Sequence, residues 1–264
     1  MIKIEKINDN IYRTVTPYKD IWTTMYIVKT EKGDLLFDAA SFDEDAQNYI
    51  VPFLKECGVT SESLKYIFIS HDHSDHAGGL GALMEYYPDA VILSRSTELR
   101  NRFAEYDVIP PQENEVFLDV LKTVTITGHT SDCAGLYDVR TKTLITGDCL
   151  QVGGIVGSEN WAANIRFPVC YFEDIEKVRK MDIDLLLTAH DYYPFGYKAK
   201  GKEEINRYLD GCREPLLKLK KLILENPTVD DEGICDIHNV SKDIPTFHAG
   251  VVKYVRKAMK KKRF

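Results

Sequence analysis

Four short runs of apolar residues in this chain each stop at a polar segment. The run at 66–70 (Tyr-Ile-Phe-Ile-Ser) is apolar and rich in residues that favour β structure, which predicts a buried strand. The same pattern recurs where strands predicted at 124–127, 144–146 and 185–187 lead into further polar residues. Since each polar segment directly follows a predicted strand, we expect the four segments to converge at one edge of a sheet. Binding sites often form at such an edge.

The rest of the pattern predicts a mixture of strands and helices. Opening strands are expected at 8–14 and 24–39, with a loop at 16–22 between them. Apolar residues at helical spacing predict helices in the remaining segments: 43–57, 172–181, from about 202 onward, and 251–259.

The polar segments contain most of the histidine in the chain. Of seven histidines, five follow the predicted strands, whereas solvated or capping histidines would be scattered. His71 and His73 are two residues apart, so they project from the same side while the backbone stays extended. Asp75 and His76 come where the chain turns toward a helix that begins near Leu80, and they can reach a second point. The pattern therefore predicts a metal site, with these candidate ligands: His71, His73, Asp75, His76, His129, Asp148 and His190.

The order and spacing of these ligands resemble the metallo-β-lactamase superfamily. Its hallmark is His-x-His-x-Asp-His, here at 71–76, followed by a distant His, Asp and His, and all seven positions match. The resemblance covers roughly residues 1–195. It implies an α+β fold, a four-layer αββα sandwich with two sheets face to face and helices outside. We expect a metallo-β-lactamase domain at 1–200 and a C-terminal helical extension at 201–264 packed on it.

The resemblance also implies a role for each ligand. Asp148 would bridge two metal ions, and Asp38, which resembles the family's early Asp motif, would support the ligand loop without binding metal. The other ligands would divide into two sets, His71, His73 and His129 for the first ion, and Asp75, His76 and His190 for the second.

Hydrolysis is the reaction that such a centre suits. Two Zn²⁺ ions, less two carboxylates and one bridging hydroxide, keep a formal charge of +1, which favours an anionic transition state. Zinc lowers the pKa of bound water to about 7, and paired ions about 3.5–4 Å apart hold both nucleophile and oxyanion. Asp75 and Asp148 are therefore the expected catalytic residues. The expected cofactor is a pair of Zn²⁺ ions, with Fe or Mn as the alternative.

The identity of the bridging residue limits the class of substrate that we expect. Many β-lactamases of the superfamily have Cys or Ser at this position, and Cys149 lies next to Asp148; on an extended strand only one of the two can face the metals. With Asp148 as the ligand, the site resembles the glyoxalase II, lactonase and phosphodiesterase branches. Gln151 stands where acyl-homoserine lactonases have tyrosine, and glyoxalase II's glutathione-binding basic residues have no clear counterparts. We expect cleavage of a small ester, thioester or lactone, with a phosphodiesterase or β-lactamase as alternatives.

An iron enzyme is a second class to consider. Persulfide dioxygenases with this scaffold bind one iron through two His and one Asp, which His71, His129 and Asp148 would match. Such an enzyme does not need the second ligand set, and that set is intact here. The sequence therefore favours the hydrolase.

A candidate substrate pocket follows the ligands in the sequence. The stretch 151–171 has no regular period, and long loops of this kind often bind ligands. Aromatic residues near the ligands would form the rim of the pocket: Tyr18, Trp22, Trp161, Tyr192 and Tyr193. His238 and His248 have no companion ligands, so we expect structural roles for them.

Composition suggests a cytoplasmic enzyme that acts on a small molecule. The chain has 264 residues and a net charge of −7, which disfavours nucleic acid as a partner. No apolar run approaches the ~18 residues that a membrane span needs. Six cysteines without close pairing predict reduced thiols. A basic cluster at 253–263 is interpreted as a solvated helix end, and the oligomeric state is left open.

Overall fold

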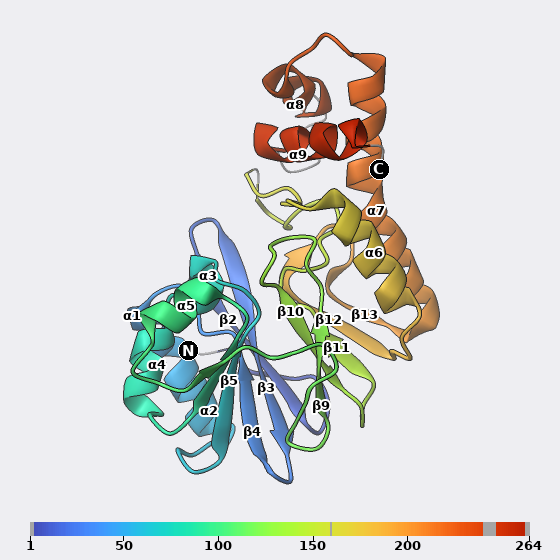
Figure 1. Cartoon of the computed structure of the whole chain (residues 1–264). Coiled ribbons are helices and arrows are strands. Elements are labelled where there is room, and N and C mark those ends of the chain that lie inside the picture. Colours follow the sequence, from blue (N-terminus) through green and yellow to red (C-terminus); the bar gives the residue numbers. More distant parts are fainter. Residues whose placement is uncertain (1–2, 159, 240–246, 262–264) are drawn as a thin grey trace. The chain divides into compact units, whose positions relative to one another are not determined.

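Two compact units make up the computed structural model, which describes residues 3–158, 160–239 and 247–261 (Figure 1). One unit comprises Met1–Thr125 with Ala134–Arg140, and the other comprises Ile126–Cys133 with Thr141–Phe264. The expected boundary between a domain at 1–200 and an extension at 201–264 stays a prediction.

The first unit is built on a seven-stranded mixed sheet in which the strands follow one another in chain order. Neighbours from β1 to β4 are antiparallel, and neighbours from β4 to β7 are parallel. The strands are β1 (Glu5–Lys6), β2 (Ile11–Tyr18), β3 (Ile21–Thr30), β4 (Gly33–Phe37), β5 (Leu64–Ile69), β6 (Val91–Ser94) and β7 (Val108–Ile109). The strand predicted at 66–70 is thus β5.

The loop predicted at 16–22 was wrong. Strands β2 and β3 continue through this segment, with Pro17 opposite Trp22 and Tyr18 opposite Ile21, and the chain reverses at Lys19, whose φ is 53°. Proline cannot donate a ladder hydrogen bond, so a strand accepts it only where no partner strand requires that donor. Here Pro17 lies beyond the part of β2 that pairs with β1, so the sheet tolerates it.

Both faces of the seven-stranded sheet are buried. Leu36, Ile67 and Ile92 belong to a core shared with the helices of the unit. On the opposite face the rings of Phe37 and Phe68 stack with centroids 5.2 Å apart. Each fully buried side chain of this size stabilises the fold by about 1.5–3 kcal/mol. The helices are α1 (Asp43–Asp45), η1 (Ala46–Ile50), α2 (Val51–Glu56), α3 (Ser74–Ala77), α4 (Leu80–Tyr86) and α5 (Thr97–Arg102), so the helix predicted at 43–57 is present as three consecutive segments.

Two further ladders complete the strands. In the first unit, β8 (Val116–Phe117), β9 (Leu121–Thr125) and β10 (Ala134–Asp138) are antiparallel. In the second unit, β11 (Thr143–Ile145) is parallel to β12 (Leu185–Tyr192), which is antiparallel to β13 (Gly196–Lys200). The predicted convergence at the edge of a single sheet was therefore wrong, because only β5 lies in the seven-stranded sheet. A strand's own residues do not reveal its partners.

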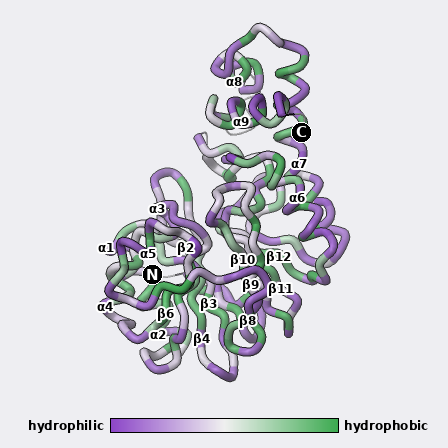
Figure 2. The backbone as a smooth tube through the Cα atoms, viewed as in Figure 1, coloured by the Kyte–Doolittle hydropathy of each residue, from purple (hydrophilic) through white to green (hydrophobic). Residues whose placement is uncertain are grey.

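The C-terminal part of the second unit is helical, as predicted. Helix α6 (Pro168–Arg179) is followed by α7 (Gly201–Glu225), α8 (Asp231–Asn239) and α9 (Ala249–Lys260), which pack on one another. Hydrophobic and hydrophilic residues alternate in short runs along these helices (Figure 2). The Arg256 guanidinium lies 2.7 Å from Asp231 and ties α9 to α8. The α+β class with C-terminal helices is confirmed.

Three further sequence predictions concern membrane spans, the basic cluster and the cysteines. Within the described ranges, no helix is both long and apolar enough to cross a lipid bilayer. The basic cluster begins on α9, while Lys262 and Arg263 lie outside the described residues. All six cysteines are free thiols, as expected.

Candidate metal centre

The first ligand group (His71, His73, Asp75 and His76) follows β5 and enters α3. The Nε2 atom of His71 lies 2.9 Å from Nδ1 of His73, so these two histidines project to the same side as predicted. The rings of His71 and His76 have centroids 4.2 Å apart. Asp75 Oδ2 lies 3.3 Å from His76 Nε2 and accepts a hydrogen bond from the Thr23 hydroxyl at 3.1 Å. Four potential ligands from six consecutive residues thus share one small volume.

A buried carboxylate, Asp38, fixes how these histidines present their nitrogens. His76 Nδ1 donates to Asp38 Oδ2 at 2.7 Å. The Ser70 hydroxyl also donates to Asp38, at 3.0 Å, so its oxygen is left to accept from His71 Nδ1, also at 3.0 Å. Both histidines therefore carry the proton on Nδ1 and offer the lone pair of Nε2. This is the outer-shell pattern that orients metal-binding histidines in proteins.

The position of Asp38 is costly to maintain. Burial raises the pKa of this carboxyl, while His76 and the hydrogen bonds from Ser70 lower it. Its φ of 66° is in the left-handed region, which costs on the order of 1–3 kcal/mol for a residue with a side chain. Strain and desolvation at one residue are expected where a functional site requires that geometry.

Glycine allows the ligand loop to pack closely on the chain that follows Asp38. A Cβ added at Gly78 would lie 1.8 Å from the Ser41 carbonyl oxygen, and one added at Gly79 would lie 2.4 Å from the Ala39 oxygen. Any side chain at either position would push the loop away from its support.

The second ligand group (His129, Asp148 and His190) lies in the second unit and is centred on a carboxylate. Asp148 Oδ1 lies 3.2 Å from His190 Nε2, while Oδ2 lies 3.8 Å from His129 Nε2. The Tyr192 hydroxyl donates to Oδ1 at 2.7 Å, and Gln151 Nε2 donates to Oδ2 at 3.2 Å. Each carboxylate oxygen thus faces a different imidazole and receives its own hydrogen bond.

His129 is oriented by the loop at 151–171, which the sequence predicted to bind substrate and not to orient a metal ligand. Its Nδ1 donates to the Asn164 carbonyl oxygen at 2.5 Å, which leaves the Nε2 lone pair facing Asp148. The Asn164 amide in turn donates to Gln151 Oε1 at 2.7 Å. Tyr171 holds the other side of Gln151, because its hydroxyl contacts both the backbone N and O of that residue. A regular sequence period could not have indicated these contacts.

Helix α6 supports the segment before His129. Asp174 accepts a hydrogen bond from the Gly128 amide at 2.9 Å, and burial raises the pKa of Asp174 to about 6. A Cβ at Gly128 would lie 2.5 Å from the Tyr171 ring. Predicting a helix near 172 was correct, but its role in holding a ligand segment was not foreseen.

Asp148, and not Cys149, faces the histidines. The two residues follow β11 in a turn, where Gly147 has a φ of 56°, and not on an extended strand as the sequence argument assumed. Cys149 is fully buried, and burial, together with a hydrogen bond to Cys133, raises the pKa of its thiol well above the usual value. A neutral buried thiol is a poor metal ligand.

The position of His190 differs from the prediction in one respect. It lies inside β12, which continues to Tyr192, and not beyond the end of the strand. The register between β12 and β13 shifts between Leu187 and Tyr192. Irregularities of this kind re-aim side chains near functional sites.

The five aromatic residues predicted to line a pocket occupy different surroundings. The Tyr18 hydroxyl lies 3.1 Å from the Ser74 hydroxyl, and Trp22 is 57% exposed. Tyr192 is fully buried with its hydroxyl on Asp148, so it supports the ligand group and is not on a rim. Tyr193 and Trp161 line two separate cavities. A shared pocket stays a prediction.

The two remaining histidines have the local partners expected of structural residues. His238 is buried against Phe247, with ring centroids 4.6 Å apart. His248 Nε2 lies 3.0 Å from the Asn160 carbonyl oxygen. Both lie in the C-terminal part of the second unit.

The donor atoms fit divalent metal ions. Zinc accepts imidazole nitrogen and carboxylate oxygen at about 2.0–2.2 Å, which places two tetrahedral ligands about 3.3 Å apart. The pair His71 Nε2 and His73 Nδ1, at 2.9 Å, and the pair Asp148 Oδ1 and His190 Nε2, at 3.2 Å, are close to that separation. Each ligand group therefore has the composition and spacing of a metal-binding cluster.

Comparison with known proteins places the chain in a family. The model of the metallo-β-lactamase superfamily matches residues 23–190, and the chain belongs to that superfamily. It is 29% identical over 143 residues to a hydroxyacylglutathione hydrolase of Prochlorococcus marinus, covering 49% of this chain and 52% of that protein. It is 22% identical over 226 residues to the atrochrysone carboxyl ACP thioesterase of Emericella nidulans, covering 84% of this chain and 69% of that protein.

The fold is also found among solved structures. A metallo-β-lactamase family protein from Thermus thermophilus superposes with a TM-score of 0.72 at 14% identity, covering 97% of this chain and 95% of that one. The four-layer αββα fold expected from the sequence is thereby confirmed. The chain is an enzyme of the hydrolase type that this superfamily contains, with His and Asp clusters suited to divalent metal.

Proposed function

We propose that the seven His and Asp ligands together bind two divalent ions, zinc in the first instance, and that the enzyme cleaves a small ester, thioester or lactone. The observation that carries this proposal is the arrangement of Asp148. Its two carboxylate oxygens face different histidines, at 3.2 Å and 3.8 Å, as a ligand shared by two ions requires. Iron or manganese is the alternative metal.

The residues of the chain would orient this chemistry. When bound, such ions act as Lewis acids and make hydroxide available near neutral pH. Tyr192 and Gln151 hold the Asp148 carboxylate, and Thr23 holds that of Asp75. Asp38 keeps the Nε2 lone pairs of His71 and His76 available. Cys149 is buried and protonated, which argues against a thiol nucleophile at this site.

Two observations support an acyl substrate. The relatives include a hydroxyacylglutathione hydrolase and an acyl-carrier-protein thioesterase, and both names describe hydrolysis of an acyl group from a thiol carrier. A cavity of about 290 Å³ lies beside the loop that orients His129, and it is lined by residues that include Trp161, Asn164, Val251 and Tyr254. Its volume suits a small, partly apolar acyl chain. We propose a free small molecule as substrate, in the cytoplasm, with neither nucleic acid nor membrane as partner.

Metal content and a substrate panel test the proposal. Protein purified without chelator should contain close to two zinc ions per chain by elemental analysis. It should hydrolyse p-nitrophenyl esters, acyl thioesters or lactones faster than bis-p-nitrophenyl phosphate or a cephalosporin, and chelator should abolish the activity. One iron per chain with little zinc would favour the dioxygenase, and a preference for the phosphodiester would show that the proposed substrate class is wrong.

A further inference from the structure

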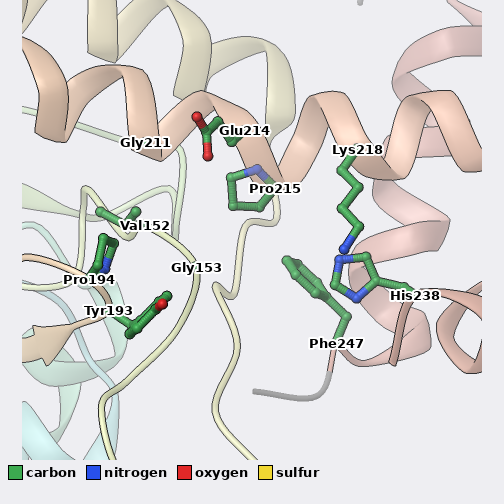
Figure 3. A pocket seen from close by; sticks show the side chains of 10 residues that line it. All are labelled: Val152, Gly153, Tyr193, Pro194, Gly211, Glu214, Pro215, Lys218, His238 and Phe247. Carbon is green, nitrogen blue, oxygen red and sulfur yellow. The ribbon is translucent and has the colours of Figure 1, made fainter. Parts of the chain in front are cut away.

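A second cavity, of about 260 Å³, lies entirely within the second unit and is lined by none of the seven predicted metal ligands (Figure 3). Helix α7 forms one wall, and His238 of α8 contributes another together with Phe247, which precedes α9. The remaining wall comes from two short segments, Val152–Gly153 and Tyr193–Pro194. These segments follow Gln151 and Tyr192, the two residues that hold Asp148.

The interior of this cavity is largely apolar. Val152 and Phe247 are buried, and the rings of Pro194 and Pro215 face the space between them (Figure 3). Gly211 contributes no side chain, because a Cβ there would lie 2.9 Å from Val152. Such a lining favours the flat ring or short hydrocarbon body of a small molecule, whose burial contributes about 25 cal/mol per Å².

One cation, Lys218, is an exposed residue at the edge of this cavity. The side chain of Lys218 extends from α7 toward the imidazole of His238 (Figure 3). Glu214 is one helical turn earlier, yet within the described parts of the chain Lys218 forms no ion pair with it or with any other carboxylate. Because Lys218 is not paired with Glu214 and lines the cavity, its ammonium group is available to pair with an anionic ligand.

His238 offers an acceptor beside this cation. Asn239 pairs with the backbone of Phe247 at two points, Oδ1 accepting from its N–H at 3.1 Å and Nδ2 donating to its carbonyl oxygen at 3.2 Å. Its Oδ1 is therefore the atom that His238 Nδ1 contacts, at 3.1 Å, so Nδ1 carries the proton. Burial lowers the pKa of His238, which leaves the imidazole neutral and Nε2 as a hydrogen-bond acceptor.

We propose that this cavity binds a small apolar hydroxycarboxylate, with the carboxylate on Lys218, a hydroxyl donating to His238 Nε2, and the apolar body against Val152, Pro215 and Phe247. Glu214 also lines the cavity, and its negative charge repels a second charge on the ligand, so a monoanion suits Lys218 better than a phosphate dianion. The site is separate from the metal ligands and does not require the proposed hydrolysis.

Mandelate, phenylacetate and mandelamide form a test set that changes one group at a time. By isothermal titration calorimetry of the metal-loaded protein, mandelate should bind most tightly. Phenylacetate, which lacks the hydroxyl, should bind several-fold more weakly, and mandelamide, which lacks the charge, at least tenfold more weakly. Equal affinity for mandelate and mandelamide would overturn the proposal.

Matched lysine variants locate the site. Lys218→Met keeps the unbranched side chain at nearly the same length, removes the charge and should weaken mandelate binding at least tenfold, whereas Lys218→Arg should retain most of it. Lys221→Met is the control, because Lys221 is exposed on the same helix and lies 3.8 Å from Glu225. Mandelate should bind Asp148→Ala protein as it binds the parent, which separates this site from the metals. Unchanged binding to Lys218→Met, or loss of binding in Asp148→Ala, would contradict the assignment.

Discussion

The two ligand groups reach similar chemistry through different kinds of structure. In the first group, four ligands come from six consecutive residues, and one buried carboxylate, Asp38, orients two of their rings. In the second group, three ligands come from separate parts of the chain, and their orientation depends on Gln151, Asn164 and Tyr192. Two of the adjacent ligands thus share one supporting residue, whereas the dispersed ligands depend on several.

The strongest test of the second group is loss of its central carboxylate. Asp148→Ala removes the one side chain that faces both His129 and His190, so kcat/KM should fall on the order of 100- to 1,000-fold. The far-ultraviolet circular dichroism spectrum should remain that of the parent, because the change leaves the core intact. Activity within threefold of the parent would show that Asp148 is not a shared ligand.

The first group should be most sensitive at Asp38, the support that two of its histidines share. Asp38→Asn removes the charge that holds His76 Nδ1 and Ser70, and zinc affinity should fall about 10- to 100-fold, as for other outer-shell partners of metal ligands. Competition with a chromophoric chelator measures the change. Unaltered zinc affinity would show that the first group does not depend on one residue.

The second group should tolerate the loss of one of the hydrogen bonds that hold Asp148. Tyr192→Phe removes a single hydrogen bond to Asp148, so activity should fall about tenfold, the equivalent of about 1.4 kcal/mol. Gln151 still contacts the other carboxylate oxygen. A loss as large as that of Asp148→Ala would mean that Tyr192 acts on the substrate directly.

A smaller effect is expected in stability at Asp174. Its pKa is raised from 3.8 to about 6, so the folded state holds its proton more tightly than the unfolded state. This group therefore stabilises the fold most below pH 4, and that contribution is lost as pH rises from about 4 through 6, by as much as about 3 kcal/mol. Urea titrations of the parent and of Asp174→Asn give the difference in their unfolding free energies. The parent should be more stable relative to the variant at pH 4.5 than at pH 7.5. A difference independent of pH would contradict it.

The smallest effect is expected away from both groups. His248→Ala removes a contact with the Asn160 carbonyl oxygen and trims one wall of the cavity proposed for the acyl chain, so it should lower kcat/KM far less than Asp148→Ala does. An effect as large as that of Asp148→Ala would show that the ligand roles are wrongly assigned.

The contrast between the groups also explains what could be predicted from the sequence. The residues at 71–76 are adjacent, and β5 before them has a clear apolar pattern, so both element and ligands were evident. Asn164 contacts His129 through its backbone oxygen, and Gln151 contacts it through its side-chain amide. Since every residue has a backbone oxygen, the sequence could not indicate the role of Asn164. The strands within 16–22 include Pro17, which a sheet accepts only where no partner strand requires its N–H, and the extent of β1 that permits it here cannot be predicted from residues 16–22 themselves.

The bond between Gln151 and Asn164 closes the base of the loop that they enclose. The Asn164 amide lies 2.7 Å from Gln151 Oε1, so residues 152–163 leave and return at a fixed pair of points. Residues 153–156 are also hydrogen-bonded to the backbone of residues 191–193, directly after His190. Changes in the first half of the segment would therefore reach the second ligand group, whereas changes in its second half would reshape the neighbouring cavity wall while the bond between Gln151 and Asn164 keeps His129 in place.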